Sequence, residues 1–223
     1  MVKVKICGIT NIEDAEAASR YGADLLGFIF VEGTPRYIEK SSAGKIIETL
    51  NSSGFSDIKK VGLFIDEEID SVVDAVSLCG LDCVQLAGSE TPAYCSILKE
   101  KLLEKCERNI NIIKVFKVAE KILPNGSYDI TEYENVDNYI FDTFDPQKAG
   151  GIGKQFDCEI ILREKDKLQK PFFIAGGLTA DKVQDIVQTV TPYGVDVSSG
   201  VEREPGKKDA VLLKEFIQNA KSA

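Results

Sequence analysis

Two hydrophobic patterns alternate along the chain. Short apolar runs rich in β-branched residues are typical of buried strands, and stretches with apolar residues three and four positions apart are typical of amphipathic helices. The runs that predict strands are 2–7, 24–30, 60–64, 83–86, 111–118, 138–142, 172–175 and 194–198. The stretches that predict helices are 12–21, 41–50, 66–78, 92–107, 180–190 and 209–220, with two shorter ones at 128–134 and 157–165.

A strand followed by a helix, repeated eight times, is the pattern of a parallel (β/α)8 barrel. An open doubly wound sheet would also alternate strands and helices, so the count alone does not decide between the two. The length of 223 residues and the absence of low-complexity or Pro-rich linkers indicate one domain. We therefore predict a single α/β barrel domain over residues 1–223, with its chemistry at the carboxyl ends of the strands.

The charge balance limits the possible partners. The chain has 27 basic and 36 acidic residues, a formal net charge of −9, and no cluster of Lys and Arg. This disfavours nucleic acid and anionic membranes as partners. An anionic substrate would need backbone amides and a few local cations, because the overall field repels it. No targeting segment or long apolar run is visible, so we expect a cytoplasmic protein.

The chain contains no histidine. Proton transfer near neutral pH must then use Asp, Glu, Cys, Lys or Tyr, and nucleophilic sites built on histidine are excluded. Histidine-rich metal sites are excluded as well. The six cysteines form no C-x-x-C pair, which favours a reducing compartment.

Cys7 ends the first predicted strand. Thr10 and Glu13 resemble a capping box that opens the next helix, so we expect the thiol to lie just before a helix N-terminus. The partial positive charge there would lower the thiol pKa from about 8.5 toward neutrality. The alternative is that Cys7 is a small buried hydrophobic residue like the other five cysteines.

Asp142 ends the sixth predicted strand, after the buried run Tyr139-Ile140-Phe141. A carboxyl group in that position would be partly desolvated, its pKa would rise, and it could act as a general acid. The alternative is an Asp that caps the following turn.

Glycine-rich segments follow two consecutive strands, at Gly176-Gly177 and at Ser199-Gly200. Small residues there let backbone N–H groups approach an anion, which matches the phosphate site after strands seven and eight of such barrels. The segment 150–154 is also glycine-rich but lacks Walker-loop spacing, so it predicts a closing loop or a plain surface turn.

Arg36 follows the second strand, where its guanidinium could bind a carboxylate or simply be solvated.

Seven motifs occur in order from residue 5 to residue 202: KICGIT at 5–10, GFIF with TPRYI at 27–38, VQLAG at 84–88, FDT at 141–143, GGIGKQFD at 150–157, IAGGL at 174–178 and VDVSSGVE at 195–202. Together they resemble the phosphoribosylanthranilate isomerase family, and KICGIT and VDVSSGVE are the most specific. The resemblance implies a TIM barrel isomerase of tryptophan biosynthesis. It also implies a cofactor-free Amadori rearrangement of N-(5'-phosphoribosyl)anthranilate to 1-(2-carboxyphenylamino)-1-deoxyribulose 5-phosphate.

The resemblance also assigns roles to residues. Cys7 would be the general base, Asp142 the general acid, and Arg36 the ligand of the anthranilate carboxylate. Gln85 and Asp196 would contact the substrate. The phosphate would be bound at Gly153, Gly176, Gly177, Ser199 and Gly200.

Two positions depart from the family pattern. Ala87 stands where the family usually has a histidine, and residues 155–158 read QFDC in place of TFDW. These two departures are compatible with a protein that binds phosphate ligands but has lost catalytic activity. Another sugar-phosphate isomerase or epimerase, including one that acts on the histidine-pathway ribotide, is a further alternative. A ribotide isomerase would be expected to use two carboxylates, whereas this chain has the Cys7 thiol. We expect a monomer, with a homodimer as the alternative.

Overall fold

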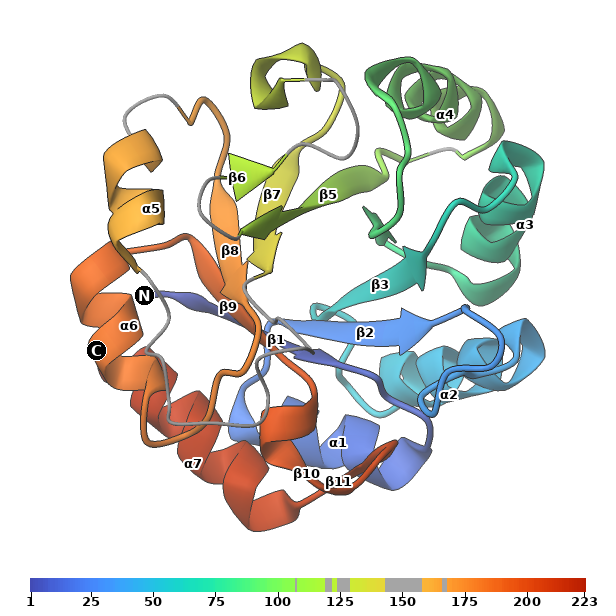
Figure 1. The fold of residues 1–223 in the computed structure, drawn as a ribbon. Coiled ribbons are helices and arrows are strands. Elements are labelled where there is room, and N and C mark those ends of the chain that lie inside the picture. The colour runs from blue at the N-terminus through green and yellow to red at the C-terminus, as the bar shows by residue number, and fades with distance from the viewer. Residues whose placement is uncertain (107, 119–121, 124–128, 143–157, 166–167) are drawn as a thin grey trace.

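The computed structural model describes residues 1–106, 108–118, 122–123, 129–142, 158–165 and 168–223. Its eight parallel strands close into a barrel, seen end-on in Figure 1. They are β1 (Lys3–Cys7), β2 (Leu25–Ile29), β3 (Lys59–Phe64), β4 (Cys83–Leu86), β5 (Asn111–Val118), β7 (Asn138–Asp142), β8 (Phe172–Ala175) and β9 (Gly194–Val197). Strand β1 pairs with both β2 and β9, and β4 pairs with β5, so the sheet has no open edge. The barrel prediction is confirmed, and the open doubly wound alternative is wrong.

Helices surround the barrel on the outside (Figure 1). They are α1 (Ile12–Tyr21), α2 (Lys40–Ser52), α3 (Ile69–Cys79), α4 (Pro92–Lys105), α5 (Cys158–Glu164), α6 (Val183–Val190) and α7 (Ala210–Lys221). No helix in the described part of the chain combines the length and the apolar character that a membrane span needs.

The helix predicted over 128–134 is wrong in its described part. Residues Ile130–Glu132 form one 3-10 turn, η1, with Asp129 and Glu132 closing a capping box around it. The next residue, Tyr133, is fully buried and donates its hydroxyl to the Glu90 carbonyl at 3.1 Å. Because burial of this ring redirects the chain after one turn, the helix cannot continue.

Two short strand pairs were not predicted. Strand β6 (Ile122–Leu123) pairs antiparallel with the end of β5, and β10 (Glu202–Glu204) pairs with β11 (Lys207–Lys208). The β10–β11 pair lies beside the end of β1, because Thr10 Oγ1 donates to the Gly206 carbonyl at 2.5 Å. Asn11 instead caps α1, accepting from the Asp14 N–H at 2.8 Å. The predicted Thr10–Glu13 capping box is therefore wrong.

The interior of the barrel changes character along its axis. An apolar cluster fills much of it: Leu25, Val61, Cys83, Ile113, Val115, Ile140, Phe173 and Ala175. Further along the strands the interior also holds buried polar residues, namely Lys5, Gln85 and Asp196. Since isolated charges are costly to bury, this end of the barrel is where function is expected.

Candidate active site

Cys7 and Asp142 lie at the same rim of the barrel, at the carboxyl ends of β1 and β7. Side chains two residues apart in a strand share a face, and Ile140 lies in the interior cluster, so Asp142 faces the same interior. Strands β9 and β8 stand between β1 and β7 in the barrel. The loops that leave β8 and β9 therefore lie between the thiol and the carboxyl group.

The Cys7 thiol is buried beside a buried ion pair. Lys5, two residues earlier on β1, donates to Asp196 Oδ1 at 2.9 Å, and the Lys5 side chain has no exposed surface. Asp196 lies opposite Lys5 in the register of β9 with β1. A Cβ atom built on Gly27 would lie 2.8 Å from Cys7 Sγ and 3.1 Å from Lys5 Nζ. Only glycine at position 27 therefore leaves both groups room.

Burial raises the pKa of the Cys7 thiol above its usual value of 9.0. The positive charges of Lys5 and Lys208 act in the opposite direction, and the carboxylate of Asp196 adds to the rise. The predicted lowering of the thiol pKa by a helix end is therefore wrong. Helix α1 begins only at Ile12 and is capped by Asn11, and the charges that lower the Cys7 pKa are those of Lys5 and Lys208.

A second ion network contacts the backbone carbonyl of Cys7. Arg36 donates from Nε and Nη2 to the two carboxylate oxygens of Glu202 at 2.8 and 2.7 Å. Lys208 Nζ donates to Glu202 Oε1 at 2.8 Å, to the Cys7 carbonyl at 2.6 Å and to the Ser198 carbonyl at 3.1 Å. The β10–β11 pair thus joins the ends of β1 and β9 to the loop that carries Arg36.

Three residues of these networks were not singled out from the sequence: Lys5, Glu202 and Lys208. Lys5 had a usable signal, because a lysine two residues from Cys7 on a buried strand must share its face. Around Cys7 the networks place the cations Lys5, Arg36 and Lys208 against the carboxylates of Asp196 and Glu202. The local balance is therefore positive in a chain of net charge −9.

The two small-residue loops lie against each other. Gly176 and Gly177 have φ of +94° and +65°, and Ser199–Val201 form a 3-10 turn, η4, directly after β9. A Cβ atom built on Gly200 would lie 1.9 Å from the Leu178 carbonyl oxygen. The structure thus brings together four of the five predicted phosphate ligands, while Gly153 lies outside the described residues.

The buried polar atoms that lack a hydrogen-bond partner among the described residues include Gln85 Oε1 and Ser198 Oγ, both near this rim. Gln85 lies two residues after Cys83 of the interior cluster, on the same face of β4. Buried acceptors are seldom left unpaired, so both atoms are suited to contact a ligand.

Comparison with known proteins agrees with this arrangement. The family model of N-(5'-phosphoribosyl)anthranilate (PRA) isomerase matches residues 4–219. The chain belongs to the N-(5'-phosphoribosyl)anthranilate isomerase family. It is accordingly an isomerase of tryptophan biosynthesis.

Individual members of the PRA isomerase family match along the whole chain. The protein of that name from Geobacter sp. (strain M21) is 41% identical over 221 residues, which cover 99% of this chain and 98% of the relative. The crystal structure of phosphoribosyl anthranilate isomerase from Thermotoga maritima is 36% identical, with a TM-score of 0.81 and 100% of both chains covered. A further crystal structure of the isomerase is a complex with reduced 1-(o-carboxyphenylamino)-1-deoxyribulose 5-phosphate, with 34% identity, a TM-score of 0.79 and 100% of both chains covered.

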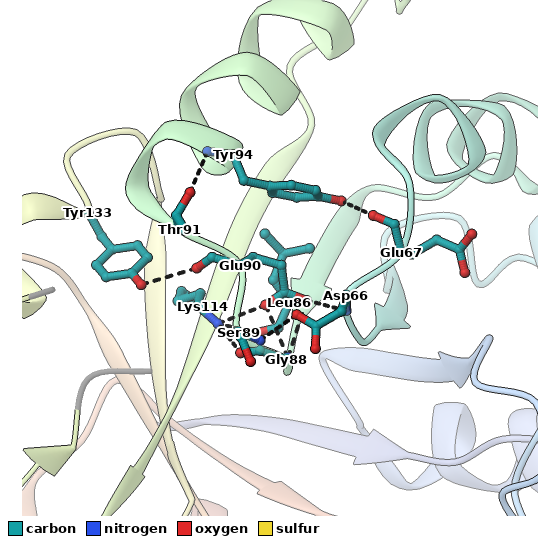
Figure 2. Close-up of polar contacts among 10 residues, drawn as sticks. All are labelled: Asp66, Glu67, Leu86, Gly88, Ser89, Glu90, Thr91, Tyr94, Lys114 and Tyr133. Atoms are coloured by element: carbon teal, nitrogen blue, oxygen red, sulfur yellow. Dashed lines mark hydrogen bonds and ion pairs between the residues drawn. The ribbon is translucent and has the colours of Figure 1, made fainter. Parts of the chain in front are cut away.

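The departure at Ala87 has a structural counterpart in the β4–α4 loop. Ala87 packs against the interior apolar cluster, and its N–H donates to the Phe64 carbonyl at 2.9 Å. The loop beyond it is held by Glu90 and Lys114, both buried (Figure 2). Lys114 Nζ donates to Glu90 Oε2 and to the Gly88 carbonyl, each at 2.9 Å. The loop is thus fixed without a histidine.

Proposed function

We propose that the protein converts N-(5'-phosphoribosyl)anthranilate to 1-(2-carboxyphenylamino)-1-deoxyribulose 5-phosphate, with Asp142 as general acid and Cys7 as general base. The observation that carries the proposal is the order of the strands. Acid and base end β7 and β1, and the two phosphate loops leave β8 and β9 between them. A substrate bound by its phosphate at this rim would hold its reacting carbons between the two groups.

The reaction needs only proton transfers. Asp142 donates a proton to the ribose ring oxygen, the C1–oxygen bond breaks, and the nitrogen lone pair forms a Schiff base at C1. Cys7 as thiolate then removes the proton from C2, giving an enolamine that tautomerises to the ketone. One proton is given and one is taken, so no redox cofactor enters the balance.

Binding groups surround this centre. Gly176, Gly177, Ser199 and Gly200 would bind the phosphate through backbone N–H groups, as glycine-rich turns do. Gln85, with its unpaired Oε1, and Asp196 would contact the polar part of the substrate. Arg36 has five N–H donors and gives two to Glu202, which leaves donors for the anthranilate carboxylate.

The test follows the loss of anthranilate fluorescence when the purified protein meets freshly generated phosphoribosylanthranilate. We expect turnover by the native chain, and a fall in kcat of about 10² or more for Cys7→Ala and for Asp142→Asn. Cys106→Ala is the matched control, because this half-buried cysteine lies at the end of α4 and should leave kcat unchanged. Near-native rates for either site variant would reject that residue's role, and binding without turnover would indicate a non-catalytic protein.

A further inference from the structure

Lys5 is a buried cation that the mechanism above does not use. Its side chain has no exposed surface, and it lies inside the barrel on the strand that ends in Cys7. Removing an ammonium group from water costs several kcal/mol even after the protein relaxes. An apolar residue would fill the same space at lower cost, so the charge calls for an explanation.

The contacts of Lys5 direct its charge toward the thiol. Asp196 Oδ1 accepts from Nζ at 2.9 Å and fixes one side of the ammonium. Nζ and Cys7 Sγ also lie close to the same glycine, Gly27, at 3.1 and 2.8 Å from the position of an added Cβ. Charge attraction to Asp196 and to Cys7, and hydrogen bonds to both, raise the pKa of Lys5 despite its burial. The ammonium therefore stays charged beside the sulfur.

We infer that Lys5 is a positioning residue for Cys7: held by Asp196, its ammonium stabilises the thiolate that removes the substrate's C2 proton. This inference rests on the proposed role of Cys7 as base. A thiol buried without a neighbouring cation would hold its proton more tightly, because burial disfavours the charged form.

The other charged groups that face Cys7 are already engaged. Lys208 of β11 donates to three oxygen atoms, including Glu202 Oε1 and the Cys7 carbonyl. Arg36 of the β2–α2 loop donates to both carboxylate oxygens of Glu202. The β2 residue opposite Cys7 is Gly27, which carries no charge. Lys5 is thus the cation whose ammonium shares the barrel interior with the sulfur atom.

The sign of the effect separates this role from a purely structural one. The Lys5 charge lowers the pKa of Cys7, whereas the Asp196 charge raises it. Lys5→Met should therefore raise the titration midpoint of the thiol, and Asp196→Asn should lower it, each by about one pH unit or more. An ion pair that merely fills the barrel would give no such opposite shifts.

The experiment is an ultraviolet titration of thiolate absorbance in the full chain without substrate, with the Cys7→Ala spectrum subtracted in each background. Lys114→Met is the matched control, because Lys114 is equally buried but lies on the outer face of β5 and pairs with Glu90 rather than with Asp196. It should leave the Cys7 midpoint unchanged. In turnover assays, Lys5→Met should move the rising limb of the kcat profile to higher pH and lower kcat at neutral pH about tenfold.

An unchanged or lowered Cys7 midpoint in Lys5→Met overturns the inference. If Lys5→Met does not fold, Asp196→Asn decides alone: a lowered midpoint supports the inference, and an unchanged or raised one overturns it. Failure of the proposed function looks different. Cys7→Ala would then keep its turnover, whatever the titrations show, whereas failure of this inference alone leaves Cys7→Ala inactive and the midpoints unmoved.

Discussion

At the residue scale, two glycines at the rim set how closely functional groups approach each other. Gly27 leaves space for Cys7 Sγ and Lys5 Nζ, and Gly200 lets the loop after β9 pass against the Leu178 carbonyl of the loop after β8. Position 200 thus determines how closely the two loops proposed to bind phosphate can approach each other. A methyl group at either position would separate groups that must lie together.

Gly200→Ala should therefore weaken substrate binding more than it destabilises the barrel as a whole. Its Cβ would meet the Leu178 carbonyl oxygen at 1.9 Å, so backbone must move, at a cost of about 1–3 kcal/mol. We expect a raised KM in the fluorescence assay and a lower urea midpoint.

Gly44→Ala is the control for that substitution. A Cβ on Gly44 in α2 would lie 3.5 Å from the Leu78 carbonyl oxygen, an ordinary contact, and alanine favours a helix by about 0.5–1 kcal/mol. It should be at least as stable as the native chain, with KM unchanged. Equal KM values for both variants would contradict the role given to Gly200.

At the element scale, the β4–α4 loop is held to its neighbours by one buried carboxylate. Glu90 accepts from the N–H groups of Asp66 and Gly88, and its partner Lys114 comes from β5 (Figure 2). Asp66 in turn accepts from the Ser89 N–H at 2.5 Å. The loops after β3 and β4 and the strand β5 therefore form one connected unit at the rim.

Glu90→Ala should disrupt this unit. Lys114 would keep a buried charge without its partner, and two backbone N–H groups would lose their acceptor, so we expect a loss of about 3–5 kcal/mol in unfolding free energy. Chemical denaturation measures it. The control is Lys101→Ala, which breaks an exposed pair with Asp70 and should cost less than about 1 kcal/mol. A loss no larger than that of the control would show that the pair does not hold the loops.

At the scale of the whole molecule, the unfolding free energy should depend on pH, because carboxylates join distant parts of the chain. Burial alone would raise the pKa of Glu202, but hydrogen bonds from Arg36 and Lys208 outweigh it and hold the pKa below 4.5. The same holds for Asp24. Burial raises its pKa, but hydrogen bonds from the Val4 N–H, Lys221 and Lys3 outweigh burial and lower the pKa below 3.8. Both groups are thus ionised in the fold at a pH where the unfolded chain binds protons.

The contribution of these carboxylates to the unfolding free energy should therefore be fully present above pH 4.5. It should be lost as the pH drops through the lowered pKa values of the folded state. Glu202→Gln should be less stable than the native chain at neutral pH, and this difference should shrink in acid. Urea titrations at a series of pH values measure it. Glu48→Gln on the exposed side of α2 is the control, and a Glu202→Gln difference that stays constant with pH would contradict the linkage.

The sequence by itself determined the order of the barrel, the strand ends that carry Cys7 and Asp142, and the two glycine-rich loops after β8 and β9. These follow from local periodicity and from the rule that parallel strands end at one rim. Only the tertiary structure decided the electrostatics around Cys7. Lys5 meets Asp196 across 191 residues, and Arg36 meets Glu202 across 166. Because burial and such long-range charges set the thiol pKa, no local helix signal could give its direction.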